Sequence, residues 1–279
     1  MAYIIQDTTL SGIADAIRAK NGTADKIKVS DMAATIEAIK AGGDDKAVAI
    51  IDRSITEYSN DSVETIGSYA FYGCSNLATL DLPAATSIGT YAFNNCSSLT
   101  TVSLPAATSI GTFAFNNCSS LTTVSLPAAT SIGYEAFNNC SSLTTVSLPA
   151  ATSISGYVFY NCLSLTAVVL PAAASIGNNA FQYCEKLTTV DLPMATSIGA
   201  YVCPLCPALK ALIIRTGQVC SLGAGLGNGT DSCYIYVPRA LINDYKAATN
   251  WAQYADKFRA LEDYTVDGTT TGELDPTKI

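Results

Sequence analysis

The sequence predicts an α/β solenoid, in which a ladder of parallel strands and short helical turns lies between small helical modules at the two ends. Two observations predict this fold: the middle of the chain repeats with a 22-residue period, and the repeated positions are apolar or end a strand. Stacked units with such a period bury their apolar side only against their neighbours. The repeated positions are Ile66, Ile88, Ile110, Ile132, Ile154, Ile176 and Ile198, then Cys74, Cys96, Cys118, Cys140, Cys162, Cys184 and Cys206, and Pro83, Pro105, Pro127, Pro149, Pro171 and Pro193.

Each unit contains one predicted strand, a corner and a return segment. The unit at residues 86–107 reads TSIGTYAFNNCSSLTTVSLPAA. In its strand, Val102 and Leu104 face inward because strand side chains alternate between two faces. Pro105 ends the strand, since it has no N–H for the next ladder bond. Residues 91–93 are expected to form a short helical turn with Phe93 inside.

The array extends beyond the seven clear units. Ile55 begins a degenerate, polar first repeat, as the terminal caps of repeat proteins require. At the other end, Ile235 and Val237 restore the strand pattern after a glycine-rich insertion at residues 222–232. The solenoid is therefore expected over residues 47–238.

The repeat pattern I-G-x-x-A-F-x-x-C-x-x-L-x-x-V-x-L-P resembles the BspA-type leucine-rich repeats of bacterial surface proteins. Ala107 stands where other leucine-rich repeats carry Asn or Cys, which fits the BspA-like class and argues against the animal-receptor type. The resemblance covers about residues 55–238. It implies a leucine-rich-repeat solenoid that serves in adhesion or partner binding, with no catalytic residues to carry over.

The N-terminal module is expected at residues 1–46, as two helices and a linker. Residues 10–17 follow the apolar i, i+3, i+4, i+7 spacing of an amphipathic helix, and Ser30 is a suitable N-cap for the second helix. The segment at residues 10–39 resembles a small module of tail and other structural proteins of bacteriophages that infect gut Firmicutes. That resemblance implies a role in attachment or assembly.

The first residues of the chain also bear on where the protein is located. The first ten residues lack the basic start and apolar stretch of a secretory signal, which agrees with a virion protein released by lysis. Two locations stay open, the extracellular or cell surface and the virion.

The C-terminal module, residues 239–279, is expected to be a helical cap followed by a polar, acidic tail. Residues 239–248 are predicted as a helix with Pro238 just outside its start, and residues 255–261 as another turn or helix. Trp251 is expected to cover the last strand.

The composition argues against an enzyme and against several partners. The 279-residue chain has no histidine and a net charge of −8, which excludes Ser-His-Asp and Cys-His catalysis and His-rich metal sites. No basic cluster suits a nucleic acid, because phosphate binding needs concentrated Lys and Arg. No apolar run reaches the about 18 residues of a membrane span. We expect no catalytic residues, no metal and no cofactor.

The ten cysteines are expected to be reduced core thiols, since neighbouring Cβ vectors in a ladder run parallel and suit a disulfide poorly. A zinc site of Cys203, Cys206, Cys220 and Cys233 is the alternative. Cys203 and Cys206 lie on core positions of the repeat, and Cys220 falls at the position that Ile110 takes in its own unit. These placements favour buried core thiols over a zinc site. A Cys220–Cys233 disulfide also stays open.

Two surfaces are candidates for binding. The first is the outer face of the strands, where polar residues alternate with the core; the second lies opposite and is rich in aromatic residues, a composition typical of adaptable recognition surfaces. The strand-face candidates are Thr101, Ser103, Thr123, Ser125, Thr145, Ser147 and Val169, on a face that also includes Ala167, Ala211 and Ile213. The aromatic candidates are Tyr69, Tyr91, Phe113, Tyr134 and Tyr157, with Tyr72, Tyr160 and Tyr201 nearby in the pattern.

These features favour a non-enzymatic recognition or adhesion protein that binds a protein or glycan on a cell or host surface. The alternative is a structural spacer or tail component of a phage virion, whose partners are other virion proteins and whose near-identical repeats set its reach. In both cases the N-terminal helices are candidates for assembly with another chain.

Overall fold

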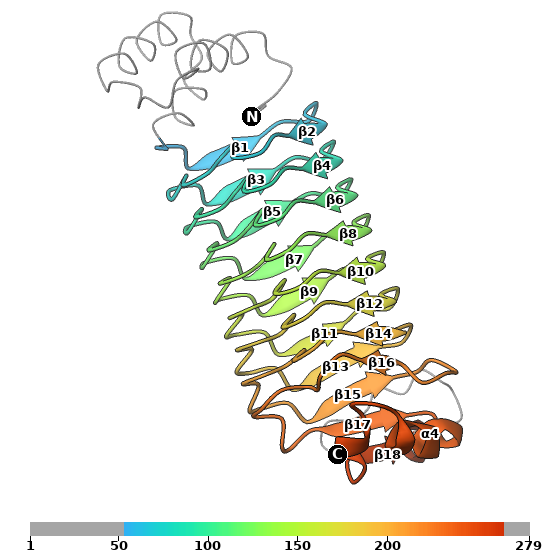
Figure 1. Ribbon diagram of the computed structural model, residues 1–279. Coiled ribbons are helices and arrows are strands. Elements are labelled where there is room, and N and C mark those ends of the chain that lie inside the picture. Colours follow the sequence, from blue (N-terminus) through green and yellow to red (C-terminus); the bar gives the residue numbers. More distant parts are fainter. Residues whose placement is uncertain (1–52, 265–279) are drawn as a thin grey trace, which may run out of the picture.

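The computed structural model describes residues 53–264, and the helices expected within residues 1–46 lie outside the described residues. The described part is a parallel β-solenoid whose turns stack along one axis from β1 to β18, as Figure 1 shows. Corresponding positions of successive repeats pair directly, as Val124 does with Val146. The predicted leucine-rich-repeat solenoid is therefore confirmed.

Each regular turn contributes one long and one short strand, and all pairings are parallel. The long strands are β1 (Glu57–Ser59), β3 (Thr79–Asp81), β5 (Thr101–Ser103), β7 (Thr123–Ser125), β9 (Thr145–Ser147), β11 (Ala167–Val169), β13 (Thr189–Leu192), β15 (Ala211–Ile214), β17 (Tyr234–Val237) and β18 (Phe258–Ala260). The short strands form one sheet of eight and are β2 (Thr65–Ile66), β4 (Ser87–Ile88), β6 (Ser109–Ile110), β8 (Ser131–Ile132), β10 (Ser153–Ile154), β12 (Ser175–Ile176), β14 (Ser197–Ile198) and β16 (Ser221–Leu222).

A proline turn connects the long strand to the short one. The N–H of Ala107 donates to the carbonyl oxygen of Leu104 at 3.2 Å, which closes a turn with Pro105 at its second position. Proline suits that position because its fixed φ matches the turn. The predicted strand end at Pro105 is confirmed.

The return segment differs from the expected helical turn. It consists of consecutive β-turns, for example the N–H of Asn94 donating to the carbonyl oxygen of Tyr91 at 3.3 Å. Between these bonds, the N–H of Phe93 donates to Ala114 of the next turn at 2.8 Å. A helix cannot continue through this segment because Tyr91 and Asn95 have positive φ, 57° and 63°.

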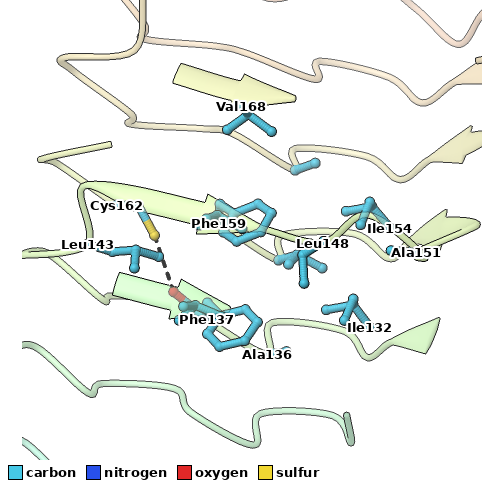
Figure 2. Packing of buried hydrophobic residues seen from close by; sticks show 14 of the residues in the cluster. Ile132, Ala136, Phe137, Leu143, Leu148, Ala151, Ile154, Phe159, Cys162 and Val168 are labelled. Atoms are coloured by element: carbon cyan, nitrogen blue, oxygen red, sulfur yellow. Dashed lines mark hydrogen bonds between the residues drawn. The ribbon is translucent and has the colours of Figure 1, made fainter. Parts of the chain in front are cut away.

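The core is a set of ladders that run the length of the solenoid. Figure 2 shows Phe137 stacked on Phe159, with ring centroids 5.8 Å apart and planes at 7°, while Ile132 and Ile154 repeat the same relation beside them. The phenylalanine and cysteine ladders are fully buried. Each unit thus buries its apolar side against its two neighbours, as the period predicts.

The glycine-rich segment forms the next turn of the ladder. The N–H of Tyr201 donates to the carbonyl oxygen of Gly225 at 2.7 Å, and that of Cys203 to Leu226 at 2.9 Å. It is Leu222 that pairs with Ile198, so this turn is longer than the regular repeat. Extra residues therefore lie between β15 and β16, and the expectation that Cys220 takes the isoleucine position was wrong.

A C-terminal cap closes the stack. It contains η1 (Arg239–Leu241), α4 (Ile242–Ala247), η2 (Ala252–Tyr254), β18 and η3 (Leu261–Tyr264). The helix predicted after Pro238 is confirmed, but residues 258–260 are a strand paired with β17, not a turn or helix. Trp251 is fully buried against Tyr245, and its Nε1–H donates to the carbonyl oxygen of Cys220 at 2.6 Å.

Candidate recognition surfaces

The strand face, defined as the outer face of the long strands, carries two rows of hydroxyl side chains. Thr123 pairs with Thr145 and Ser125 with Ser147, and all four are exposed. Thr101 is likewise exposed, whereas Ser103 is half-buried. Val169 interrupts the rows with an exposed fraction of 52%, beside the exposed Ala167. The structure thus brings together the seven residues predicted for this face.

The strand face does not remain open along its whole length. Ala211 and Ile213, expected to be part of it, are buried with Tyr236, and Leu261 packs against them. The C-terminal cap covers this end because the chain after β18 lies over the outer side of β15 and β17. On β13, Asp191 accepts two hydrogen bonds from Arg215, at 2.8 and 3.3 Å.

The aromatic side, defined by Tyr69, Tyr91, Phe113, Tyr134 and Tyr157, follows the short strands. In each turn, one residue on this side has a positive φ, between 53° and 63°. Its backbone N–H points along the solenoid axis toward the next turn. For example, the N–H of Tyr91 donates to Thr112 of the next turn at 2.9 Å. The residues at this position are Tyr69, Tyr91, Phe113, Glu135, Tyr157, Asn179 and Tyr201.

A second positive-φ position, further along each turn, is filled differently. Asn95, Asn117, Asn139 and Asn161 occupy it in four successive turns. Each of the last three donates from Nδ2 to Oδ1 of the asparagine before it, at 3.0, 2.9 and 2.7 Å. Asparagine tolerates the left-handed region better than an aromatic residue does. Four of the seven residues in this row are asparagine, the others being Gly73, Tyr183 and Leu205, whereas five of the seven in the first row are aromatic.

The rings on the aromatic side form two arrangements. Tyr69, Tyr91 and Phe113, which we term the stacked ladder, lie nearly parallel: the first pair is 4.9 Å apart at 15° and the second 4.6 Å apart at 11°. The stack ends at Tyr134, whose ring is 5.7 Å from Phe113 and turned by 80°.

Tyr134 begins what we term the tilted cluster, which also contains Tyr157, Tyr160 and Tyr183. Neighbouring rings in it are 5.3 to 5.8 Å apart, with planes at 62°, 46° and 81°. Tyr134 is 41% exposed, whereas the other three are half-buried.

Glu135 lies beside the tilted cluster. Its Oε2 accepts hydrogen bonds from Nδ2 of Asn138 at 2.6 Å and Nδ2 of Asn116 at 3.4 Å. Partial burial raises the pKa of the Tyr134 phenol. The neighbouring Glu135 raises it further, through a hydrogen bond and through its negative charge. The carboxylate is therefore held in place next to that ring.

Sequence reasoning missed two members of this region. Tyr183 stands at the position of the asparagine row, so its place beside Tyr160 does not follow from the aromatic period. One feature of the sequence could have identified Glu135, since it is one of few charged residues in the middle of the chain.

The ten cysteines, all within residues 53–264, are buried, and none of them forms a disulfide. Burial raises the thiol pKa, to about 12 for Cys140, Cys220 and Cys233. Within residues 53–264, no three acidic, histidine or cysteine side chains are arranged to hold a metal ion, the four cysteines of the zinc alternative included. No helix in that range has the length and apolarity to span a membrane.

Comparison with solved structures finds similar proteins, several of which are named as leucine rich. A leucine rich cell surface protein from Faecalibacterium prausnitzii is 25% identical with a TM-score of 0.48, over 66% of this chain and 60% of that protein. The T. pallidum leucine rich repeat protein is 26% identical with a TM-score of 0.47, over 69% and 82%. The pneumococcal vaccine antigen PcpA is 17% identical with a TM-score of 0.46, over 74% and 66%. The chain thus spans about 60% of the length of the F. prausnitzii protein.

Comparison with curated protein sequences finds no significant match. Comparison with protein families matches the BspA type leucine rich repeat region in six copies, at residues 53–152 and 108–224. These ranges together cover more than half of the chain and contain the ladders described above. The chain belongs to the BspA type leucine rich repeat family.

Proposed function

We propose that the chain is a non-enzymatic recognition or adhesion protein that binds a protein or glycan on a cell or host surface, and that it acts at the cell surface or on a virion. Leucine-rich repeat families such as the BspA type are typically non-enzymatic, and their solenoids present long surfaces to a partner. Residues 1–46 are proposed as the assembly module and residues 47–238 as the projecting part.

One observation carries the proposal: aromatic residues occupy the left-handed position on the aromatic side. That conformation costs a residue with a Cβ roughly 1–2 kcal/mol. Tyr69, Tyr91, Phe113, Tyr157 and Tyr201 nevertheless adopt it, although Asn179 shows that the position accepts asparagine. Strain of this kind is retained where the side chain serves a purpose other than stability.

The test is binding of the fluorescent full-length chain to bacterial cells, host matrix proteins and a glycan array. The proposal predicts saturable binding to at least one class, which heat-unfolded chain does not reproduce. Absence of binding to all three classes would contradict it.

The alternative, a spacer or virion tail component, is favoured by the near identity of neighbouring units. Residues 108–129 repeat residues 86–107 with a single change, Phe113 for Tyr91. Deleting either residues 108–129 or residues 152–173 should shorten the solenoid by one strand spacing, about 4.8 Å. A spacer predicts no other effect from either deletion, whereas recognition by the tilted cluster predicts that only the second abolishes binding.

The assembly role of residues 1–46 has its own test. Light scattering should be measured on residues 1–279 and on residues 47–279. The role predicts an assembly of several chains for residues 1–279 and a single chain for residues 47–279. Equal particle masses would contradict the role.

A further inference from the structure

We propose that the tilted cluster, with Glu135, binds an uncharged linear glycan laid along the solenoid axis. The inference rests on the proposed recognition function and assigns it a ligand class and a place. Three features support it: the exposure and tilt of Tyr134, the charge of the site, and the extent of the cluster over successive turns.

The ring faces distinguish the tilted cluster from the stacked ladder. In the ladder, Tyr91 has Tyr69 over one face and Phe113 over the other, at 15° and 11°. In the cluster, the plane of Tyr134 is inclined by 80° to Phe113 and by 62° to Tyr157, so no neighbouring ring covers its face in parallel. A pyranose ring presents weakly positive C–H bonds on one side, and these pack against the negative face of an aromatic ring.

The local sequence differs where the orientation changes. Tyr134 lies one residue before the left-handed position, which Glu135 takes instead. Gly156 occupies the position of Tyr134 in the next turn, and a Cβ added there would lie 3.5 Å from Cε2 of the Tyr134 ring. Because 3.5 Å is an ordinary contact distance, the Tyr134 ring lies against the next turn here, and its changed orientation accompanies the one-residue shift.

The charge of the site selects against acidic ligands. Lys186 and Lys210 are the only cationic residues between residues 62 and 214, whereas Glu135 lies within the cluster. A carboxylate held by Asn138 and Asn116 accepts hydrogen bonds from sugar hydroxyl groups and repels the carboxylates or sulfates of an acidic glycan. An uncharged polyol matches this combination.

The extent of the cluster points to a polymer. Tyr134, Tyr157 with Tyr160, and Tyr183 belong to three successive turns, with neighbouring centroids 5.3 to 5.8 Å apart. A linear glycan along the axis meets a ring at each turn, whereas a monosaccharide meets one. Affinity should therefore rise with chain length up to the number of units that the cluster can contact.

The experiment is isothermal titration of the full-length chain with defined oligosaccharides and soluble polysaccharides. The uncharged probes are mannan, galactan and β-glucan fragments of increasing length, and the acidic probes are hyaluronan and polygalacturonate. Tyr134→Ala and Tyr157→Ala should each weaken binding about tenfold, from the loss of one ring contact. Thr123→Ala on the strand face is the matched control and should leave the affinity unchanged.

Equal losses in Thr123→Ala and Tyr134→Ala would overturn the assignment to the tilted cluster, and tighter binding of acidic probes would overturn the ligand class. Thermal unfolding of each variant excludes loss of the fold as the cause. If the chain binds cells or matrix proteins but none of the uncharged probes, the glycan inference fails and the recognition function stands. If it binds none of these, both fail.

Discussion

The thiol of Cys162 donates a hydrogen bond to the backbone carbonyl oxygen of Phe137, 3.3 Å away in the preceding turn (Figure 2). The same bond recurs along the cysteine ladder, always between equivalent positions of neighbouring turns. The carbonyl oxygen of Phe137 also accepts the N–H of Cys140 at 3.2 Å, so the Cys162 thiol is a second donor to it inside the core. The cysteine of the repeat is therefore explained by packing and hydrogen bonding together.

Replacing Cys162 with alanine should lower the free energy of unfolding by about 1–3 kcal/mol, because it leaves a cavity and removes that donor. Cys162→Ser should lose less, since a hydroxyl still donates. Urea unfolding measures both, with the exposed Ser153→Ala as the control. A Cys162→Ala variant as stable as the control would contradict the role of the bond.

Alkaline pH should destabilise the protein through its thiols. Burial raises the pKa of Cys140 from 9.0 to about 12, so the folded state keeps its proton while the unfolded state loses it. The stabilising contribution is complete below pH 9 and is lost between pH 9 and 12, by at most about 1.4 kcal/mol per pH unit for each such thiol.

Urea unfolding at a series of pH values tests this dependence. Cys140→Ala should show a shallower loss of unfolding free energy above pH 9 than the unchanged protein does. If the unfolding free energy of the two proteins fell equally steeply with pH, this thiol would not contribute to the alkaline loss of stability.

Close stacking of the turns makes Gly133 hard to replace. A Cβ at Gly133 would lie 2.6 Å from the backbone carbon of Gly111 and 2.6 Å from the nitrogen of Thr112. Gly133→Ala should lower the free energy of unfolding by about 1–3 kcal/mol or more, because backbone atoms must move. Gly217→Ala is the matched control, since no atom lies within 4 Å of its added Cβ. Equal unfolding midpoints would argue against this packing of the turns.

The C-terminal cap should depend on Trp251, which packs on Tyr245 and Phe258 and hydrogen-bonds to Cys220. Trp251→Ala should cost about 3–5 kcal/mol and increase amide hydrogen exchange in β17 and β18 first. The exposed Asn243→Ala on α4 should change neither quantity. Unchanged exchange in these strands would mean that the cap does not protect the last turns.

The repeat period is sufficient to predict the solenoid, because every unit repeats the same core positions. It fails where the period itself changes: Cys220 was misplaced because the turn from Ile198 to Leu222 is longer than the others. The strand β18 was missed because Phe258–Ala260 lacks the apolar spacing of the repeat and is defined by its pairing with β17.

The candidate surfaces were predictable as sets of residues but not as arrangements. Alternation along a strand assigns Thr123 and Thr145 to the outer face, yet it cannot show that Leu261 covers Ile213. The period groups Tyr91 with Tyr134, but the tilt of the second ring accompanies its one-residue shift and its contact with the next turn. Tertiary contacts decide both outcomes.

The most direct test of recognition through the aromatic side is flow cytometry of fluorescent chain on the bacterial or host cells that it binds. Two double variants should be compared with the unchanged protein, Tyr134→Ala with Tyr157→Ala, and Thr123→Ala with Thr145→Ala. The account predicts that the first loses cell binding and the second keeps it, with both folded by thermal unfolding. Retention of binding by the tyrosine variant, or its loss only in the threonine variant, would contradict the account.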